Sequence, residues 1–144
     1  MISTSLLLLL LATVHRVHCV ELIQPGSTVL TPGQSMTLTC KVSGYSLTDS
    51  SYCTGWIRQP AGKALEWVAL ACGSGSTYNS EKLKSRFQVS RDTSSSTVTL
   101  TGQNMQTEDT AVYYCARYWG GYFDYWGKGT SVTVTSAVQS APKS

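Results

Sequence analysis

The sequence predicts an all-β protein built as a sandwich of two antiparallel sheets. From Met36 to Ser43, apolar residues alternate with threonine, lysine and serine in a period of two. Such alternation is typical of a half-buried strand, whose successive side chains point to opposite faces. Clusters of turn-forming residues, such as Pro32–Gly33 and Asp92–Ser96, separate the blocks, and no window presents a long apolar helical face.

Strands are expected wherever the alternation returns. It does so at Phe87–Val89, Val98–Leu100 and Val132–Val134, each time against serine, threonine or glutamine neighbours. The regular return of buried-type residues argues against a disordered serine- and threonine-rich chain. We therefore expect many short strands joined by turns.

The first 19 residues predict a secretory signal peptide that lies outside the fold. Leu6 to Leu11 form an unbroken leucine run, and Val17–Cys19 follows with a small residue at the expected cleavage position. The apolar run is too short to span a bilayer and lacks a basic stop-transfer flank. A membrane anchor is the alternative interpretation. The expected folded domain covers residues 20–136, and residues 137–144 are expected to begin a linker into a following domain.

The reactive groups of the chain argue against catalysis. The only histidines, His15 and His18, lie in the expected leader, so the mature chain lacks the imidazole of Ser-His, Cys-His and histidine–metal sites. Glu108 and Asp109 are adjacent carboxylates, but neighbours on an extended chain diverge. The glycine-rich segment 73–76 is not followed by the Lys-Ser or Lys-Thr of a phosphate loop. We expect no enzyme, no catalytic residue, no cofactor and no metal.

Net charge and cysteine content exclude two classes of partner and indicate an oxidising compartment. A net charge of +3 is too small to indicate binding to nucleic acid or to an anionic membrane. Of five cysteines, Cys19 belongs to the expected leader, which leaves an even number suited to disulfides in an oxidising compartment. No Cys-x-x-Cys pair is present, so a zinc site is not indicated.

Five segments carry a family resemblance. They are Trp56–Pro60, Ala64–Trp67, Arg86–Phe87, Asp109–Cys115 and Trp126–Thr130. Together they resemble an antibody heavy-chain variable region, and the resemblance runs from Val20 to Ser136. The tryptophan of Trp126-Gly-x-Gly favours a heavy chain, because light chains and T-cell receptor chains usually carry phenylalanine there. The segment 59–64 is more similar to a bony-fish heavy chain than to a mammalian one.

The resemblance implies an immunoglobulin variable-type (V-set) β-sandwich of two antiparallel sheets with about nine strands. A disulfide between Cys40 and Cys115 would join the two sheets, with Trp56 packed against it. Tyr113, two residues before Cys115, is placed to be the tyrosine of the corner between strands E and F.

The resemblance also assigns structural roles near the ends of the sandwich. Arg86 and Asp109 are expected to form an ion pair that closes its base. Gly127 and Gly129 are expected to flank a β-bulge, where glycine adopts backbone angles that a Cβ would forbid.

Three hypervariable loops are implied at one end of the sandwich, at about Gly44–Cys53, Ala71–Thr77 and Ala116–Tyr125. Five of the nine residues from 117 to 125 are aromatic. This composition is typical of an antigen-binding surface, because large rings give contact area at little entropic cost. The expected antigen contacts are Asp49, Ser50, Ser51 and Tyr52 in the first loop, Ser74 and Ser76 in the second, and Tyr118, Trp119 and Tyr122 in the third.

The remaining residues of the third loop have expected structural roles. Phe123 and Tyr125 are expected to pack inward or against a partner chain. Arg117 and Asp124 are expected to pair across the base of the loop.

Cys53 and Cys72 depart from the common family pattern. Each is expected where a loop meets one of two neighbouring strands, so a bridge with a Cα–Cα distance of about 4.4–6.8 Å is feasible. We expect a Cys53–Cys72 disulfide that ties the first loop to the second. Two free thiols, or a bridge to another chain, are the alternatives.

The resemblance further implies a surface for a light-chain variable domain. Its expected residues are Ile57, Gln59, Leu65, Trp67, Tyr114 and Trp126. Leu65 and Trp67 are the informative pair, because heavy-chain domains that work alone usually carry polar residues there and so avoid an exposed apolar patch.

The implied function is antigen recognition by an immunoglobulin heavy chain, either secreted or on the cell surface in a B-cell receptor. The implied partners are a light-chain variable domain, an unidentified antigen and the constant domains of the same heavy chain. No nucleic acid is implied, and a membrane is implied only through a portion absent from this sequence. The alternatives are a variable module of a T-cell or innate receptor and a non-immune adhesion sandwich.

Overall fold

The computed structural model describes residues 19–136, so the expected leader up to residue 18 and the expected linker at 137–144 lie outside the described part of the chain. The described elements follow in the order β1 (Glu21–Ile23), β2 (Thr28–Leu30), β3 (Met36–Ser43), β4 (Cys53–Pro60), β5 (Glu66–Cys72), β6 (Thr77–Asn79), β7 (Phe87–Asp92), β8 (Thr97–Gly102), a 3-10 turn η1 (Thr107–Asp109), β9 (Ala111–Trp119), β10 (Tyr122–Trp126) and β11 (Thr130–Val134).

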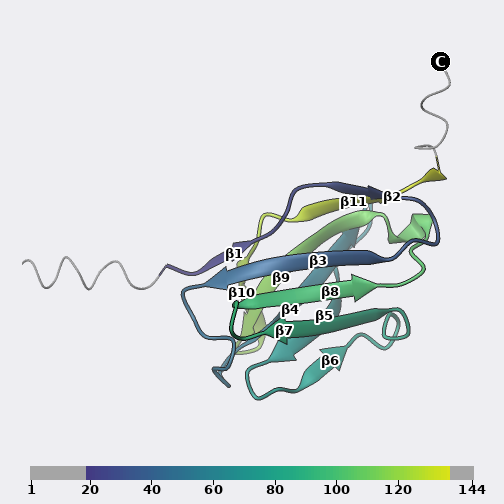
Figure 1. Ribbon diagram of the computed structural model, residues 1–144. Helices are drawn as coiled ribbons and strands as arrows, with labels where there is room; N and C mark the ends of the chain where they lie inside the picture. The colour runs from purple at the N-terminus through teal and green to yellow at the C-terminus, as the bar shows by residue number, and fades with distance from the viewer. Residues whose placement is uncertain (1–18, 137–144) are drawn as a thin grey trace, which may run out of the picture.

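The strands form two sheets that lie face to face (Figure 1). One sheet has the order β1-β3-β8-β7, and the other has the order β2-β11-β9-β4-β5-β6, with β10 added on β9. The predicted all-β sandwich is confirmed. The strands exceed the expected nine because the first strand is divided into β1 and β2, which belong to different sheets, and because the third loop forms a strand of its own, β10.

The core lies between the two sheets and follows the alternation read in the sequence. Every second residue of β3 is buried, beginning with Met36. Cys40 on β3 and Cys115 on β9 form a disulfide with a Cα–Cα distance of 6.3 Å. Trp56 on β4 pairs in register with Cys115 and is fully buried in the same cluster. With a sequence separation of 75 between its cysteines, the bridge stabilises the fold by roughly 4–5 kcal/mol in the chain-entropy model.

A buried charge network closes the base of the sandwich. The Tyr113 hydroxyl donates a hydrogen bond to the Asp109 carbonyl oxygen at 2.8 Å, as expected for the corner tyrosine. The Asp109 carboxylate accepts from both terminal nitrogens of Arg86, each at 2.9 Å, which is the expected pair. It also accepts from Arg58 Nη1 at 2.9 Å, and Arg58 Nε donates to Glu66 at 2.7 Å.

This network shifts the titration of its members. Burial alone raises the pKa of Asp109, but hydrogen bonds from Arg86, the Gln106 backbone N–H and Arg58 outweigh it, so the pKa falls below its ordinary range. Burial raises the pKa of Tyr113 to about 12, so its hydroxyl keeps the proton that it donates.

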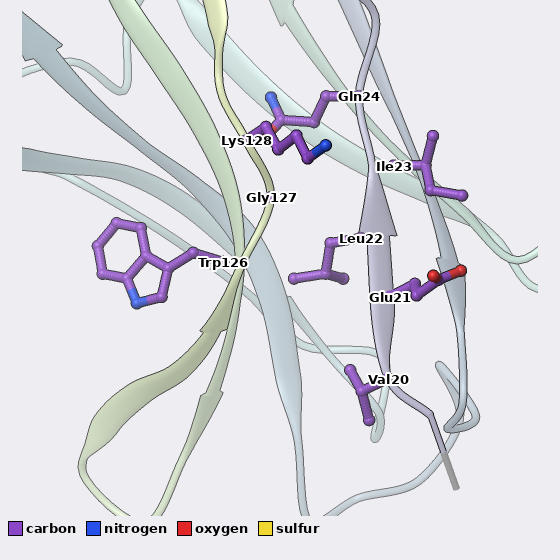
Figure 2. A pocket seen from close by; sticks show the side chains of 8 residues that line it. All are labelled: Val20, Glu21, Leu22, Ile23, Gln24, Trp126, Gly127 and Lys128. Carbon is purple, nitrogen blue, oxygen red and sulfur yellow. The ribbon is translucent and has the colours of Figure 1, made fainter. Parts of the chain in front are cut away.

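The Gln24 side chain links the N-terminal segment to β9 and to the start of β11. The Gln24 amide makes four hydrogen bonds, to Tyr113 O (2.9 Å), Thr130 Oγ1 (3.2 Å), Cys115 N (3.0 Å) and Gly129 N (3.1 Å). A Cβ on Gly127 would lie 2.3 Å from Gln24 Oε1. Figure 2 shows the groove here, of 460 Å³, with Leu22 pointing toward the segment around Gly127 and the Trp126 ring pointing away.

The register shows the expected β-bulge at Gly127 and Gly129. Trp126 pairs with Ala116 and Thr130 pairs with Tyr113, so three residues, 127–129, lie opposite two residues of β9. A second register shift lies between Phe123 and Tyr125 within β10. Gly129 adopts a positive φ of 94°, so glycine is favoured at that position.

Candidate functional site

The three loops leave the strands at one end of the sandwich, opposite the end at which β11 leaves it (Figure 1). The third is a β-hairpin formed by β9 and β10, in which Trp119 pairs with Tyr122. Gly120 and Gly121 form the two-residue turn with φ of 64° and 97°, as a type I′ turn requires. The Trp119 and Tyr122 rings are both exposed and lie edge to face, 6.4 Å apart.

The rings further down the hairpin are less accessible than its tip. Tyr118 is half-buried and packs edge to face on Phe123, with ring centroids 5.2 Å apart. Phe123 is likewise half-buried, and Tyr125 is exposed in the isolated domain. Of the third-loop residues expected to contact antigen, Tyr118 therefore lies against the flank of the hairpin, and Trp119 and Tyr122 lie at its tip.

The base of the hairpin is held by Arg117, which is buried. Its Nε donates to Asp124 Oδ1 at 3.1 Å and its Nη2 to Asp124 Oδ2 at 2.5 Å. Its guanidinium also lies over the rings of Tyr45 (4.9 Å), Tyr52 (4.1 Å) and Tyr125 (4.8 Å). Cation–π contacts of this kind are attractive at these distances. Arg117 therefore joins the first loop to the third.

Two tyrosines of the first loop form part of this support. Tyr45 was not singled out from the sequence, because nothing in its local pattern shows that a ring from residue 45 reaches residue 117. Burial raises the pKa of Tyr45 to about 12, and its hydroxyl is within 2.6 Å of Thr54 Oγ1. Tyr52, expected to contact antigen, is half-buried and lies 5.3 Å from Tyr45, so much of its ring faces Arg117.

The polar residues of the first two loops are exposed. Asp49, Ser50 and Ser51 form a turn in which Asp49 Oδ1 accepts from the Ser51 N–H at 2.9 Å. Ser74 and Ser76 are also exposed in the second loop.

The backbones of the first two loops are in direct contact. The Gly73 N–H donates to the Tyr52 carbonyl at 3.0 Å. A Cβ on Gly73 would lie 2.0 Å from the Asp49 carbonyl oxygen, so a residue without a side chain is needed for this approach.

Cys53 and Cys72 face each other as register partners on β4 and β5 and are joined by a disulfide. Their Cα–Cα distance is 3.9 Å, shorter than the range expected for a bridge between loop mouths.

A residue that the sequence analysis missed supports the backbones of both loops. Arg91 Nη1 on β7 donates to the Leu47 carbonyl at 2.6 Å and to the Cys72 carbonyl at 2.8 Å. The three segments are distant in sequence, so no local signal indicates the contact.

Apolar side chains are exposed on the outer face of the sheet that contains β9, β4 and β5. Leu65 is 49% exposed and Trp67 is 39% exposed. Trp126 is exposed as well and packs edge to face on Tyr114 at 5.7 Å.

Two other residues expected on this face differ in accessibility. Gln59 is exposed. Ile57 is only 3% exposed, because its register partners Trp67 and Tyr114 flank it on either side. Ile57 therefore supports this face from beneath and offers little surface itself.

In residues 19–136, His, Cys, Asp and Glu form no group of three or more that could hold a metal ion. Within the same residues, no helix has the length and hydropathy needed to cross a membrane.

Comparison with known proteins agrees with this architecture. Residues 23–135 match the family model for the immunoglobulin V-set domain, and the chain belongs to that family. It is 48% identical over 126 residues to the mouse (Mus musculus) protein "Ig heavy chain V region MOPC 141", covering 81% of this chain and 86% of the mouse one. It is 49% identical over 115 residues to the Xenopus laevis protein "Ig heavy chain V region XIG14", covering 78% and 84%. Within the V-set family, these similarities place it with immunoglobulin heavy-chain variable regions.

Proposed function

We propose that this chain recognises antigen through the three loops at one end of its sandwich, as the variable domain of an immunoglobulin heavy chain. The observation that carries the proposal is the third-loop hairpin. Trp119 and Tyr122 stand exposed on a two-residue turn, while Arg117 and Asp124 hold its base. Exposed aromatic rings on a rigid support are the arrangement from which binding hot spots are built.

The first two loops complete the proposed surface. Asp49, Ser50 and Ser51 offer polar groups beside the hairpin, and Ser74 and Ser76 do so from the second loop. The link between Cys53 and Cys72 restricts the relative movement of these loops, which lowers the entropic cost of binding.

The proposed partner is a light-chain variable domain that covers the exposed apolar face. Leu65, Trp67 and Trp126 are all exposed on this face, and a partner would remove their apolar surface from water. Tyr114 packs on Trp126, and Gln59 is exposed on β4. We also propose that residues 137–144 lead into constant domains, and that the chain acts in a secreted antibody or in a B-cell receptor.

Co-expression with a panel of light-chain variable domains, scored by co-purification, tests the pairing. The wild-type chain is expected to co-purify in a one-to-one complex. Leu65→Arg is expected to weaken pairing by about tenfold or more, because it places a charge against an apolar partner surface. Ile23→Arg is the matched control, because Ile23 is exposed on β1, which belongs to the other sheet.

Two outcomes would count against the proposed pairing. One is a soluble wild-type monomer that associates with none of the light chains. The other is equal loss of pairing in Leu65→Arg and Ile23→Arg, which would indicate a general effect of the added charge.

A further inference from the structure

An apolar pocket of 440 Å³ lies on the flank of the third-loop hairpin. Its lining residues come from five strands and are Cys53, Trp67, Leu70, Tyr78, Tyr118 and Phe123. The pocket lies where the proposed antigen surface, represented by Tyr118, meets the proposed light-chain face, represented by Trp67. Its volume is within the range of about 300–1,000 Å³ that small-ligand sites occupy.

The chemistry of the lining selects a neutral occupant. None of the six lining residues carries a charge. The charged residues next to them in sequence are paired: Arg117 with Asp124, and Glu66 with Arg58. A charged group placed in this pocket would lose hydration without gaining a partner, which is costly. Four of the lining side chains are aromatic, and their rings favour stacked or edge-to-face contact with another ring.

Two of the lining residues, Tyr78 and Tyr118, carry a phenolic hydroxyl. The hydroxyls of Tyr78 and Tyr118 accept or donate no hydrogen bond to any residue between 19 and 136. A phenolic hydroxyl can act as donor or acceptor. An occupant that combines a ring with one hydrogen-bonding group would therefore match both the walls and these hydroxyls, as is usual in ligand pockets.

The walls are held in place before any ligand arrives. Tyr118 pairs in register with Cys53 on one side and with Phe123 on the other. Leu70 pairs with Tyr78 across β5 and β6. Cys53 is further tied to β5 by its disulfide. Because strands form the walls, binding requires little ordering of the chain.

We propose that this pocket is a subsite for a neutral aromatic group of the antigen, one that carries a hydrogen-bonding substituent. This inference rests on the proposed antigen-binding function and names the chemical class of group that the heavy chain receives beside its third loop. The antigen group enters beside Tyr118, while Trp119 and Tyr122 contact the antigen at the tip of the hairpin.

The test uses N-phenyl-1-naphthylamine, a neutral aromatic amine whose fluorescence rises in apolar surroundings. It is titrated into the chain alone and into the chain co-purified with a light-chain variable domain. Saturable one-to-one binding is expected in both. Leu70→Trp fills the pocket and is expected to weaken probe binding by about tenfold or more. Ile23→Ala is the control, because Ile23 is exposed on β1 in the other sheet and is not part of the lining; it is expected to bind the probe within about twofold of wild type.

A second variant keeps the test informative if Leu70→Trp does not fold. Tyr78 is exposed on the edge strand β6, so Tyr78→Ala removes one wall without disturbing the core. It is expected to weaken probe binding by about fivefold or more. Circular dichroism confirms that each variant has the wild-type fold.

The outcomes separate this proposal from the proposed function. Absence of saturable binding to the chain in either form, or unchanged binding by folded Leu70→Trp and Tyr78→Ala, overturns the subsite. Binding to the free chain that disappears in the complex shows that a light-chain side chain fills the pocket, and this too overturns the subsite. Failure to pair with any light chain, with probe binding retained, contradicts the proposed pairing alone.

Discussion

Arg117 and Asp124 form a two-point ion pair across the base of the third-loop hairpin, with Nε–Oδ1 and Nη2–Oδ2 distances of 3.1 and 2.5 Å. Asp124 lies where the register of β10 shifts, so the pair fixes a position at which the strand pairing is irregular. The same guanidinium contacts the rings of Tyr45 and Tyr52 in the first loop. One ion pair therefore sets the relation between two of the three loops.

Replacing Asp124 by asparagine should loosen this hairpin. The neutral amide can still accept a hydrogen bond, but it cannot make the stronger charge-assisted pair. The free energy of unfolding is expected to fall by about 1–2 kcal/mol, measured by urea denaturation. Glu81→Gln is the control, because the Glu81–Lys84 pair is exposed and contributes little. An effect in Glu81→Gln as large as that in Asp124→Asn would contradict the prediction.

Asp109 is expected to make the stability of the domain sensitive to acid. Its hydrogen bonds lower the pKa in the folded state, so its contribution is present above the unfolded value of about 3.9 and is lost as pH falls through the lower folded value. Asp109→Asn leaves Arg58 buried beside a neutral group and should reduce stability by about 3–5 kcal/mol at neutral pH. The free energy of unfolding of Asp109→Asn should fall less than that of the wild type as the pH is lowered from about 5 to below the unfolded pKa of about 3.9. Urea denaturation at a series of pH values measures this difference.

Glu108→Gln is the matched control for Asp109→Asn. Glu108 is the neighbouring carboxylate, but it is exposed and lies outside the network. Its replacement should leave both the stability and its acid dependence close to wild type. Wild-type stability that stays constant as the pH falls below about 3.9 would contradict the role given to Asp109.

The two glycines of the hairpin turn are required for their backbone conformation. A Cβ at Gly121 would meet no atom within 4 Å, so the effect of Gly121→Ala comes from its φ of 97° alone. Each of Gly120→Ala and Gly121→Ala should lower the free energy of unfolding by about 1–2 kcal/mol. Gly26→Ala is the control, because that position has open space and no positive φ. Equal stability of all three variants would contradict the assigned turn.

Gln24 and Gly127 should behave as one unit in a double-mutant cycle. Gly127→Ala places a methyl group against the Gln24 amide and displaces it, so each single change should lose the same hydrogen bonds, at about 2–3 kcal/mol. The double variant should be no less stable than Gln24→Ala alone, because no side chain remains to clash. Urea denaturation of the four proteins gives the coupling energy. Additive losses would show that the two residues act independently.

The sequence predicted the parts of the fold that depend on local pattern. Period-two alternation predicted strands such as Met36–Ser43, because burial on one face dictates residue type at every second position. It did not predict β10, because the aromatic run after Gly121 has no alternation and its strand forms only by pairing with β9.

Contacts between distant segments were harder to predict. Arg58 reaches Asp109 across 51 residues of sequence, and Arg91 reaches Leu47 across 44. Neither partner is recognisable from its neighbours, since the contact depends on how the sheets are stacked. The family resemblance predicted the Arg86–Asp109 ion pair but not the part that Arg58 plays in it. It also predicted the positions of the three loops, but not the pocket on the flank of the third-loop hairpin.

The Cys53–Cys72 bridge should be reduced before the Cys40–Cys115 bridge. Cys40 and Cys115 are 0% exposed, whereas Cys72 is 8% exposed and Cys53 is half-buried at the edge of the pocket, so a thiolate can reach only the second bridge in the folded protein. Graded treatment with dithiothreitol, followed by alkylation and peptide mass analysis, should label Cys53 and Cys72 first.

Removal of each bridge should have a different consequence for the fold. Cys53→Ala with Cys72→Ala should lower stability by about 2–3 kcal/mol and still allow folding, because β4 and β5 remain paired from Thr54 to Arg58. Cys40→Ala with Cys115→Ala should lose about 4–5 kcal/mol or fail to fold, because the bridge joins the two sheets at the centre of the core. Two results would contradict these predictions. Simultaneous reduction of both bridges would show that dithiothreitol reaches them equally. Labelling of Cys53 without reductant would show that Cys53 is a free thiol and not part of a bridge.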